Sequence, residues 1–162
     1  MRKLLLVAIP AITIMLATAC QPPAEEAPPA RTAEQVQADV DALRATWQEL
    51  ANADNAAGVA DLYTEDAVFI DQYGGTNSGK AAIATYFERG LPQVAGYDIK
   101  VVGTVHDGDL VASYGTWSAM MGEMPASGMW QTVGQYQADG TLKLRVHSSM
   151  VPAPAPAAAP AT

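Results

Sequence analysis

The hydrophobic period of this chain changes near Pro92, and that change restricts the fold class. Before it, apolar residues recur at steps of three and four, which is typical of amphipathic helices. After it, tight-turn signals at Asp107-Gly108 and Asp139-Gly140 separate segments rich in apolar and aromatic residues. These segments predict strands over residues 97–105, 110–120, 128–137 and 142–150. Helices followed by an antiparallel meander indicate an α+β domain.

The longest predicted helix covers residues 33–52 and begins with a capping box formed by Thr32 and Gln35. Its apolar residues recur at steps of four and three, so they form one stripe that faces the core. The charged residues are interpreted as the solvated face of this helix: Glu34, Asp39, Asp41, Arg44 and Glu49.

Two shorter helices and one strand are predicted next. Asp54 or Asn55 caps a short helix, which is expected to bury Val59, Leu62 and Tyr63. A third helix begins near Gly79, with Asn77 or Ser78 as its cap, and ends at Gly90.

The predicted strand between these helices, Val68 to Ile70, is apolar and is followed directly by Asp71. A carboxyl group beside apolar side chains has a raised pKa and suits general base catalysis. An aspartate at a strand end is also a common turn former, so both interpretations stay open.

The N-terminus has the plan of a secretory signal: Arg2 and Lys3, an apolar run, and small residues before the sole cysteine, Cys20. The segment 16–20 resembles a bacterial lipobox, with Ala17 where Leu is usual, which implies diacylation of Cys20. Ordinary signal cleavage is the alternative. We therefore expect a lipid-anchored protein of the bacterial cell envelope, on the outer membrane and facing the periplasm.

The expected organisation is a signal peptide over residues 1–19, a Pro/Ala/Glu tether over 20–31, one domain over 32–151 and a disordered Pro/Ala tail over 152–162. The formal charge is −8. Loss of Arg2 and Lys3 on maturation leaves 7 basic and 17 acidic residues, a net charge of −10. This charge makes nucleic acid an unfavourable partner.

The motifs in the middle of the chain suggest a family. Their order is Leu62-Tyr63, Asp66-Ala67-Val68, Asp71, Gly74-Gly75 and Gly79-Lys80. This pattern resembles the nuclear-transport-factor-2-like superfamily, in particular its SnoaL-like and ketosteroid-isomerase-like members. The resemblance implies a cone-shaped domain, with N-terminal helices packed in a curved, mainly antiparallel sheet. It also implies a pocket between helices and sheet, and a homodimer through the outer sheet face.

The resemblance places Asp71 where ketosteroid isomerases keep the aspartate that shuttles the proton. Those enzymes also use a tyrosine and a protonated aspartate to stabilise the enolate. Thr46 and Gly134 stand nearest to these positions, so neither donor is present. Because an oxyanion hole often supplies the largest share of the rate enhancement, steroid isomerase activity is not expected.

We expect a pocket for a small apolar or carbonyl-containing ligand. The sequence shows no metal signature, and no cofactor is expected. His106 is expected at a solvated hairpin. Simple alternation places His147 on the outer face with Lys143 and Arg145, unless a β-bulge reverses the parity. The residues expected to line the pocket are Trp47, Tyr63, Phe69, Asp71, Tyr86, Trp117 and Trp130.

Two function classes follow from these observations. The first is a lipid-anchored module that binds a small ligand or dimerises, without turnover. The second is a SnoaL-like or ketosteroid-isomerase-like enzyme in which Asp71 abstracts a proton next to a carbonyl group. The binding module is favoured, because only the base of the required base-and-donor pair is recognisable.

The lipobox predicts that processing of the precursor depends on Cys20. Globomycin should block maturation, and Cys20→Ser should abolish both lipidation and this processing. A Cys20→Ser chain that is still processed and still fractionates with membranes would contradict this prediction.

Overall fold

The computed structural model describes residues 31–152, and the predictions for the signal peptide, Cys20 and the tail from residue 153 lie outside them. No helix within the described residues is long and apolar enough to cross a membrane. The elements are α1 (Ala33–Asn52), α2 (Ala56–Asp61), β1 (Tyr63–Ile70), β2 (Thr76–Ser78), α3 (Lys80–Gly90), the 3-10 helix η1 (Leu91–Gln93), β3 (Val94–Asp107), β4 (Leu110–Met121), β5 (Met124–Tyr136) and β6 (Leu142–Met150).

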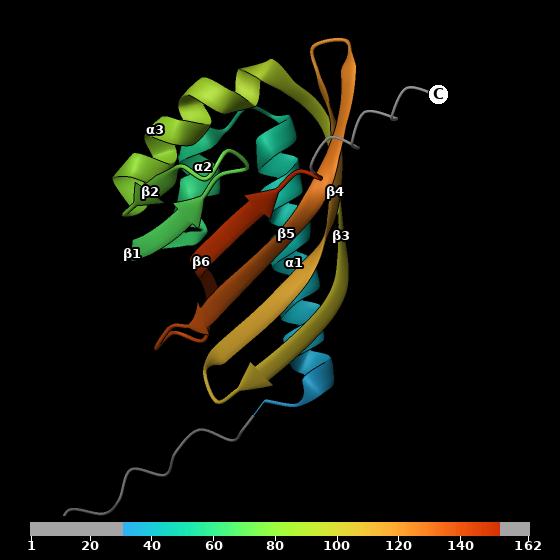
Figure 1. Cartoon of the computed structure of the whole chain (residues 1–162). Coiled ribbons are helices and arrows are strands. Elements are labelled where there is room, and N and C mark those ends of the chain that lie inside the picture. The colour runs from blue at the N-terminus through green and yellow to red at the C-terminus, as the bar shows by residue number, and fades with distance from the viewer. Residues whose placement is uncertain (1–30, 153–162) are drawn as a thin grey trace, which may run out of the picture.

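The strands form one curved sheet in the order β2-β1-β6-β5-β4-β3. All neighbouring pairs are antiparallel except β1 and β6, which are parallel. Helix α1 runs along the inner face of the long strands, whereas α2 and α3 lie beside β1 and β2 (Figure 1). The prediction of an α+β domain with N-terminal helices in a curved, mainly antiparallel sheet is confirmed.

Helix α1 begins as predicted, because Gln35 N–H donates to Thr32 Oγ1 and Thr32 N–H donates to Gln35 Oε1. The prediction for the solvated face of this helix was wrong for one residue. Arg44 is only 3% exposed and lies on the buried stripe of the helix. It follows Val40 by four residues and precedes Trp47 by three, so helical geometry places all three on one side.

The structure corrects two predicted details near β1. Tyr63 does not belong to the second helix, since it opens strand β1. Asn77 and Ser78 do not cap α3, because they lie in β2 and pair with Phe69 and Val68. Gly79 is the N-cap, with a φ of 84° that glycine adopts readily. Asn77 and Ser78 therefore pair in the sheet and do not cap α3.

The outer face of the sheet carries exposed apolar side chains from four strands. In antiparallel pairing, residues opposite each other lie on the same face. Met129 is paired with Met150, and Val105 is paired with Ala112. The large apolar residues of this outer face are Val105, Leu110, Tyr114, Met120, Met129, Val146 and Met150.

These residues are the surface through which the expected homodimer would form, since a contiguous apolar face is a common subunit interface. We predict that the full chain carrying Cys20→Ser has the mass of two chains in light scattering. Tyr114→Lys should shift it toward the monomer, because a charge would be buried at the interface. The control is Ala38→Lys, at an exposed position on α1. A monomer at high micromolar concentration would contradict the prediction.

Candidate functional site

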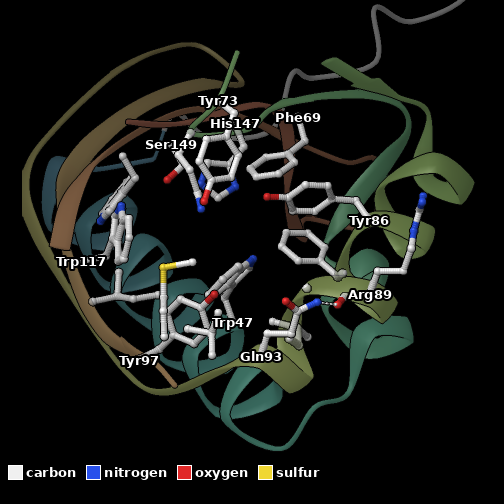
Figure 2. Close-up of a pocket in the computed structure, with 18 of the residues that line it drawn as sticks. Trp47, Phe69, Tyr73, Tyr86, Arg89, Gln93, Tyr97, Trp117, His147 and Ser149 are labelled. Carbon is white, nitrogen blue, oxygen red and sulfur yellow. Dashed lines mark hydrogen bonds between the residues drawn. The ribbon is translucent and has the colours of Figure 1, made fainter. Parts of the chain in front are cut away.

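A cavity of about 400 Å³ lies between the helices and the inner face of the sheet. Figure 2 shows side chains from opposite sides converging on it. Helices α1 and α3 provide one wall, and strands β3 to β6 provide the opposite one. The lining is rich in large aromatic residues: Trp47, Phe69, Tyr73, Tyr86, Phe87, Tyr97, Trp117 and Trp130.

The predicted pocket residues separate into two groups. Trp47, Phe69, Tyr86, Trp117 and Trp130 line the cavity. Tyr63 and Asp71 do not line it: Tyr63 is fully buried behind the wall, and Asp71 lies in the turn after β1.

Asp71 acts as a turn former in this structure. Its Oδ1 accepts hydrogen bonds from Tyr73 N–H and Gly75 N–H, both at 2.9 Å. Its own backbone N–H donates to the Gly75 carbonyl oxygen at 2.9 Å. A side chain at Gly75 would collide with the Asp71 carboxylate, which explains the glycine there. The structure therefore supports the turn interpretation that the sequence left open.

His147 faces the cavity, so the prediction from simple alternation is wrong. Val133 pairs with Val146, but Gly134 pairs with Leu144, which leaves Arg145 without a partner on β5. This β-bulge reverses the parity of the residues that follow. His147 is 5% exposed and lies among the aromatic rings of the cavity. His106, in contrast, is exposed as predicted.

A hydrogen-bond chain connects His147 to the wall behind it. The Tyr63 hydroxyl lies 2.6 Å from His147 Nδ1, and Trp47 Nε1–H donates to the same hydroxyl at 3.3 Å. The buried phenolic proton of Tyr63 needs an acceptor, which the indole cannot provide and His147 Nδ1 can, so we assign this hydrogen bond as donated by Tyr63 to Nδ1. A neutral imidazole that accepts at Nδ1 carries its proton on Nε2. Nε2–H is therefore the donor that His147 presents to the cavity.

Burial accounts for the protonation states of Tyr63 and His147 in this hydrogen-bond chain. It raises the pKa of the Tyr63 hydroxyl, which stays protonated. It also lowers the pKa of His147 well below 6.5, and the charge of Arg44 acts in the same direction. His147 is therefore neutral at neutral pH. It is a poor general base there, because bases work best with a pKa near the operating pH.

Arg44 is the site residue that sequence reasoning missed. Its Nη2 donates to Thr132 Oγ1 at 3.0 Å, and its guanidinium carbon lies 4.0 Å from the centre of the Trp130 ring. Its Nε is buried and has no hydrogen-bond partner among the described residues. Burial lowers the pKa of Arg44 to about 10, so the side chain remains positively charged at neutral pH. The sequence feature that could have placed Arg44 on the buried face is its spacing of four residues from Val40 and three from Trp47.

Two tyrosines add hydroxyl groups to the aromatic walls. The Tyr86 hydroxyl points into the cavity (Figure 2). Burial, followed by the charge of Asp71, raises the pKa of Tyr86 to about 12. Burial alone raises the pKa of Tyr97 to about 12. Both hydroxyls are protonated at neutral pH and can donate hydrogen bonds to a ligand.

A family model for the SnoaL-like domain matches residues 43–147, and the cone of helices and curved sheet has the corresponding architecture. The chain belongs to the SnoaL-like domain family. The matched segment contains Arg44 and His147, the two residues that structure rather than sequence placed in the cavity. A search of curated proteins finds no significant match to this SnoaL-like domain.

Solved structures show the same fold. A protein of unknown function from Mycobacterium tuberculosis is 20% identical with a TM-score of 0.65, covering 72% of each chain. A ketosteroid isomerase-like protein from Erwinia carotovora atroseptica is 15% identical with a TM-score of 0.65, covering 72% of this chain and 96% of its own. An NTF-2 like protein of unknown function from Shewanella oneidensis is 13% identical with a TM-score of 0.63, covering 71% and 98%. These similarities establish the fold.

The buried neutral state of His147 predicts a pH-dependent stability. Its folded-state pKa is depressed, so below pH 6.5 the unfolded chain takes up a proton that the folded chain excludes. Stability therefore falls as the pH falls, by about 1.4 kcal/mol per pH unit for one such group. Urea unfolding between about pH 6.5 and 5, above most carboxyl titrations, should show this slope.

The slope should disappear in His147→Gln, whose side-chain oxygen can still accept from Tyr63. His106→Gln removes the exposed imidazole and should retain the slope. Equal slopes for wild type and His147→Gln would show that His147 is not held neutral by burial.

Proposed function

We propose that this SnoaL-like domain is a binding module for a small, ring-containing organic molecule, which it holds in the cavity without chemical turnover. The observation that carries the proposal is the aromatic cavity itself. A volume of about 400 Å³ is suited to a small organic ligand. The hydroxyls of Tyr86 and Tyr97, together with Nε2–H of His147, supply the few polar groups that orient such a ligand.

The walls of the cavity are held by contacts between the aromatic rings. Trp47 makes edge contacts with Phe87 and Tyr97, with ring centres 5.7 Å and 5.5 Å apart. Phe69 contacts Tyr86 in the same way at 5.0 Å. Rings fixed by their neighbours lose little conformational freedom when a ligand enters. This preorganisation supports a binding role.

An enzymatic role has less support. The candidate base, Asp71, uses one carboxylate oxygen for two turn hydrogen bonds and does not line the cavity. No Asp or Glu occurs among the described residues that do line it. His147, the histidine of the lining, has a pKa too low for efficient general base catalysis at neutral pH.

The location of the protein remains part of the proposal. Acylation of Cys20 would fix the chain to the outer membrane, facing the periplasm, and the proline-rich tether over residues 20–31 would separate the domain from the lipid. The supporting features are the signal plan and the lipobox. A cavity of this kind would then sample small molecules of the cell envelope.

Binding can be measured from intrinsic fluorescence, since all three tryptophans of the chain line the cavity. We predict that 2-naphthamide, a neutral aromatic probe, changes the tryptophan emission of the full chain carrying Cys20→Ser in a saturable way. Ser149 lies in the cavity wall beside Trp130, its cross-strand partner. Ser149→Phe should therefore fill the cavity and weaken binding by about tenfold or more.

Two variants act as controls. Ser118→Phe makes the same change at an exposed position of β4 and should leave binding intact. Asp71→Asn should also keep the affinity, because Asp71 lies outside the lining. Absence of saturable binding to the wild type, or full affinity in Ser149→Phe, would refute the binding proposal.

A further inference from the structure

We propose that the ligand of this cavity is an organic anion, whose carboxylate is bound by Arg44 on the cavity floor while its apolar body contacts the aromatic walls. This inference rests on the proposed binding function and names the class of ligand. The physical basis is a buried positive charge for which the described part of the chain provides no counter-charge.

Arg44 is an uncompensated buried cation. The ion pairs of the described residues join Arg31 to Asp109, Lys80 to Asp61 and Glu65, and Lys100 to Asp98, and Arg44 takes part in none of them. Its one hydrogen bond within residues 31–152 is to the neutral hydroxyl of Thr132. Nε finds no partner in this part of the chain, although a guanidinium offers five N–H donors. Burying a charge in this way is unfavourable unless a counter-charge is bound.

The sheet places further donors next to Arg44. Thr132 pairs with His147, and Trp130 pairs with Ser149, in the register of β5 and β6. Of these four residues, Trp130, His147 and Ser149 line the cavity and form its floor. Arg44 contacts one member of each pair, since it donates to Thr132 and stacks over Trp130. Nε2–H of His147 and the hydroxyl of Ser149 therefore lie on the same floor as the guanidinium. Three donors in one region match a group with two acceptor oxygens.

The composition of the lining favours a negatively charged ligand over a neutral or cationic one. The chain has 17 acidic and 9 basic residues, yet the described lining contains Arg44 and Arg89 and no Asp or Glu. A cationic ligand would meet only like charge in the cavity, and a neutral one would leave the Arg44 charge unpaired. A monoanion neutralises Arg44 and leaves its apolar part to the aromatic walls.

A purely structural role for Arg44 makes a different prediction. In that case the contacts with Thr132 and Trp130 are the whole function of the side chain, and the cavity would not distinguish ligands by charge. The unpaired N–H group at Nε would then not indicate a bound ligand. Two probes of equal shape and different charge separate these roles.

The experiment compares 2-naphthoate with 2-naphthamide, which differ mainly by the carboxylate, at pH 7.5 by titration of the full chain carrying Cys20→Ser. We expect 2-naphthoate to bind about tenfold to a hundredfold more tightly, as a charge-assisted hydrogen bond in a buried site implies. Arg44→Met should remove this preference while 2-naphthamide still binds. Lys100→Met, at an exposed position on β3 outside the cavity lining, should keep it.

Each outcome is decisive. If the wild type binds both probes equally, or prefers the amide, the anion inference is wrong and the binding function stands. If neither probe binds, the binding function itself fails and this inference fails with it. Should Arg44→Met not fold, Arg44→Lys retains the charge and loses the planar fork, and its preference for 2-naphthoate should decrease. An unchanged preference in the arginine variants would remove Arg44 from the site.

Discussion

The site depends on a single extra residue in β6. Arg145 is skipped in the register between β6 and β5, and this bulge changes which face of the sheet the following side chains occupy. Without it, His147 and Ser149 would point to the outer face, and the cavity would lose its polar floor. A bulge also bends and twists the strand, which suits a sheet that curves around α1. One backbone irregularity thus serves both the shape of the cone and the chemistry inside it.

The cavity combines features that oppose stability. The guanidinium of Arg44 is buried and has no carboxylate partner among the residues that the structure describes. A histidine is held neutral by burial among aromatic rings. A domain selected for stability alone would fill this volume with aliphatic side chains. Natural proteins violate such rules mainly at functional sites. Arg44, His147 and the open aromatic volume occur together, which is why the site is interpreted as a place for a ligand.

Sequence reasoning identified the wall residues more successfully than the polar ones. Trp47, Phe69, Tyr86, Trp117 and Trp130 line the cavity, because large aromatic residues on a core-facing helix or strand point inward by periodicity. Asp71 follows an apolar strand, which is typical of a desolvated catalytic carboxyl group, but a strand end is also where a turn begins. Backbone N–H groups of the turn donate hydrogen bonds to the Asp71 carboxylate, and Asp71 does not line the cavity.

The sequence by itself determined the local elements: the capping box and span of α1, the end of α3, the β-meander and, through the ordered motifs, the SnoaL-like fold. These follow from hydrophobic period, capping residues and turn chemistry, which act between residues close in the chain. Only the tertiary structure decided the polar site. The face of the sheet that His147 occupies depends on the pairing between two strands. The role of Arg44 depends on the residues that it meets on the other side of the core. Both are non-local properties, and no pattern confined to one segment of the chain encodes them.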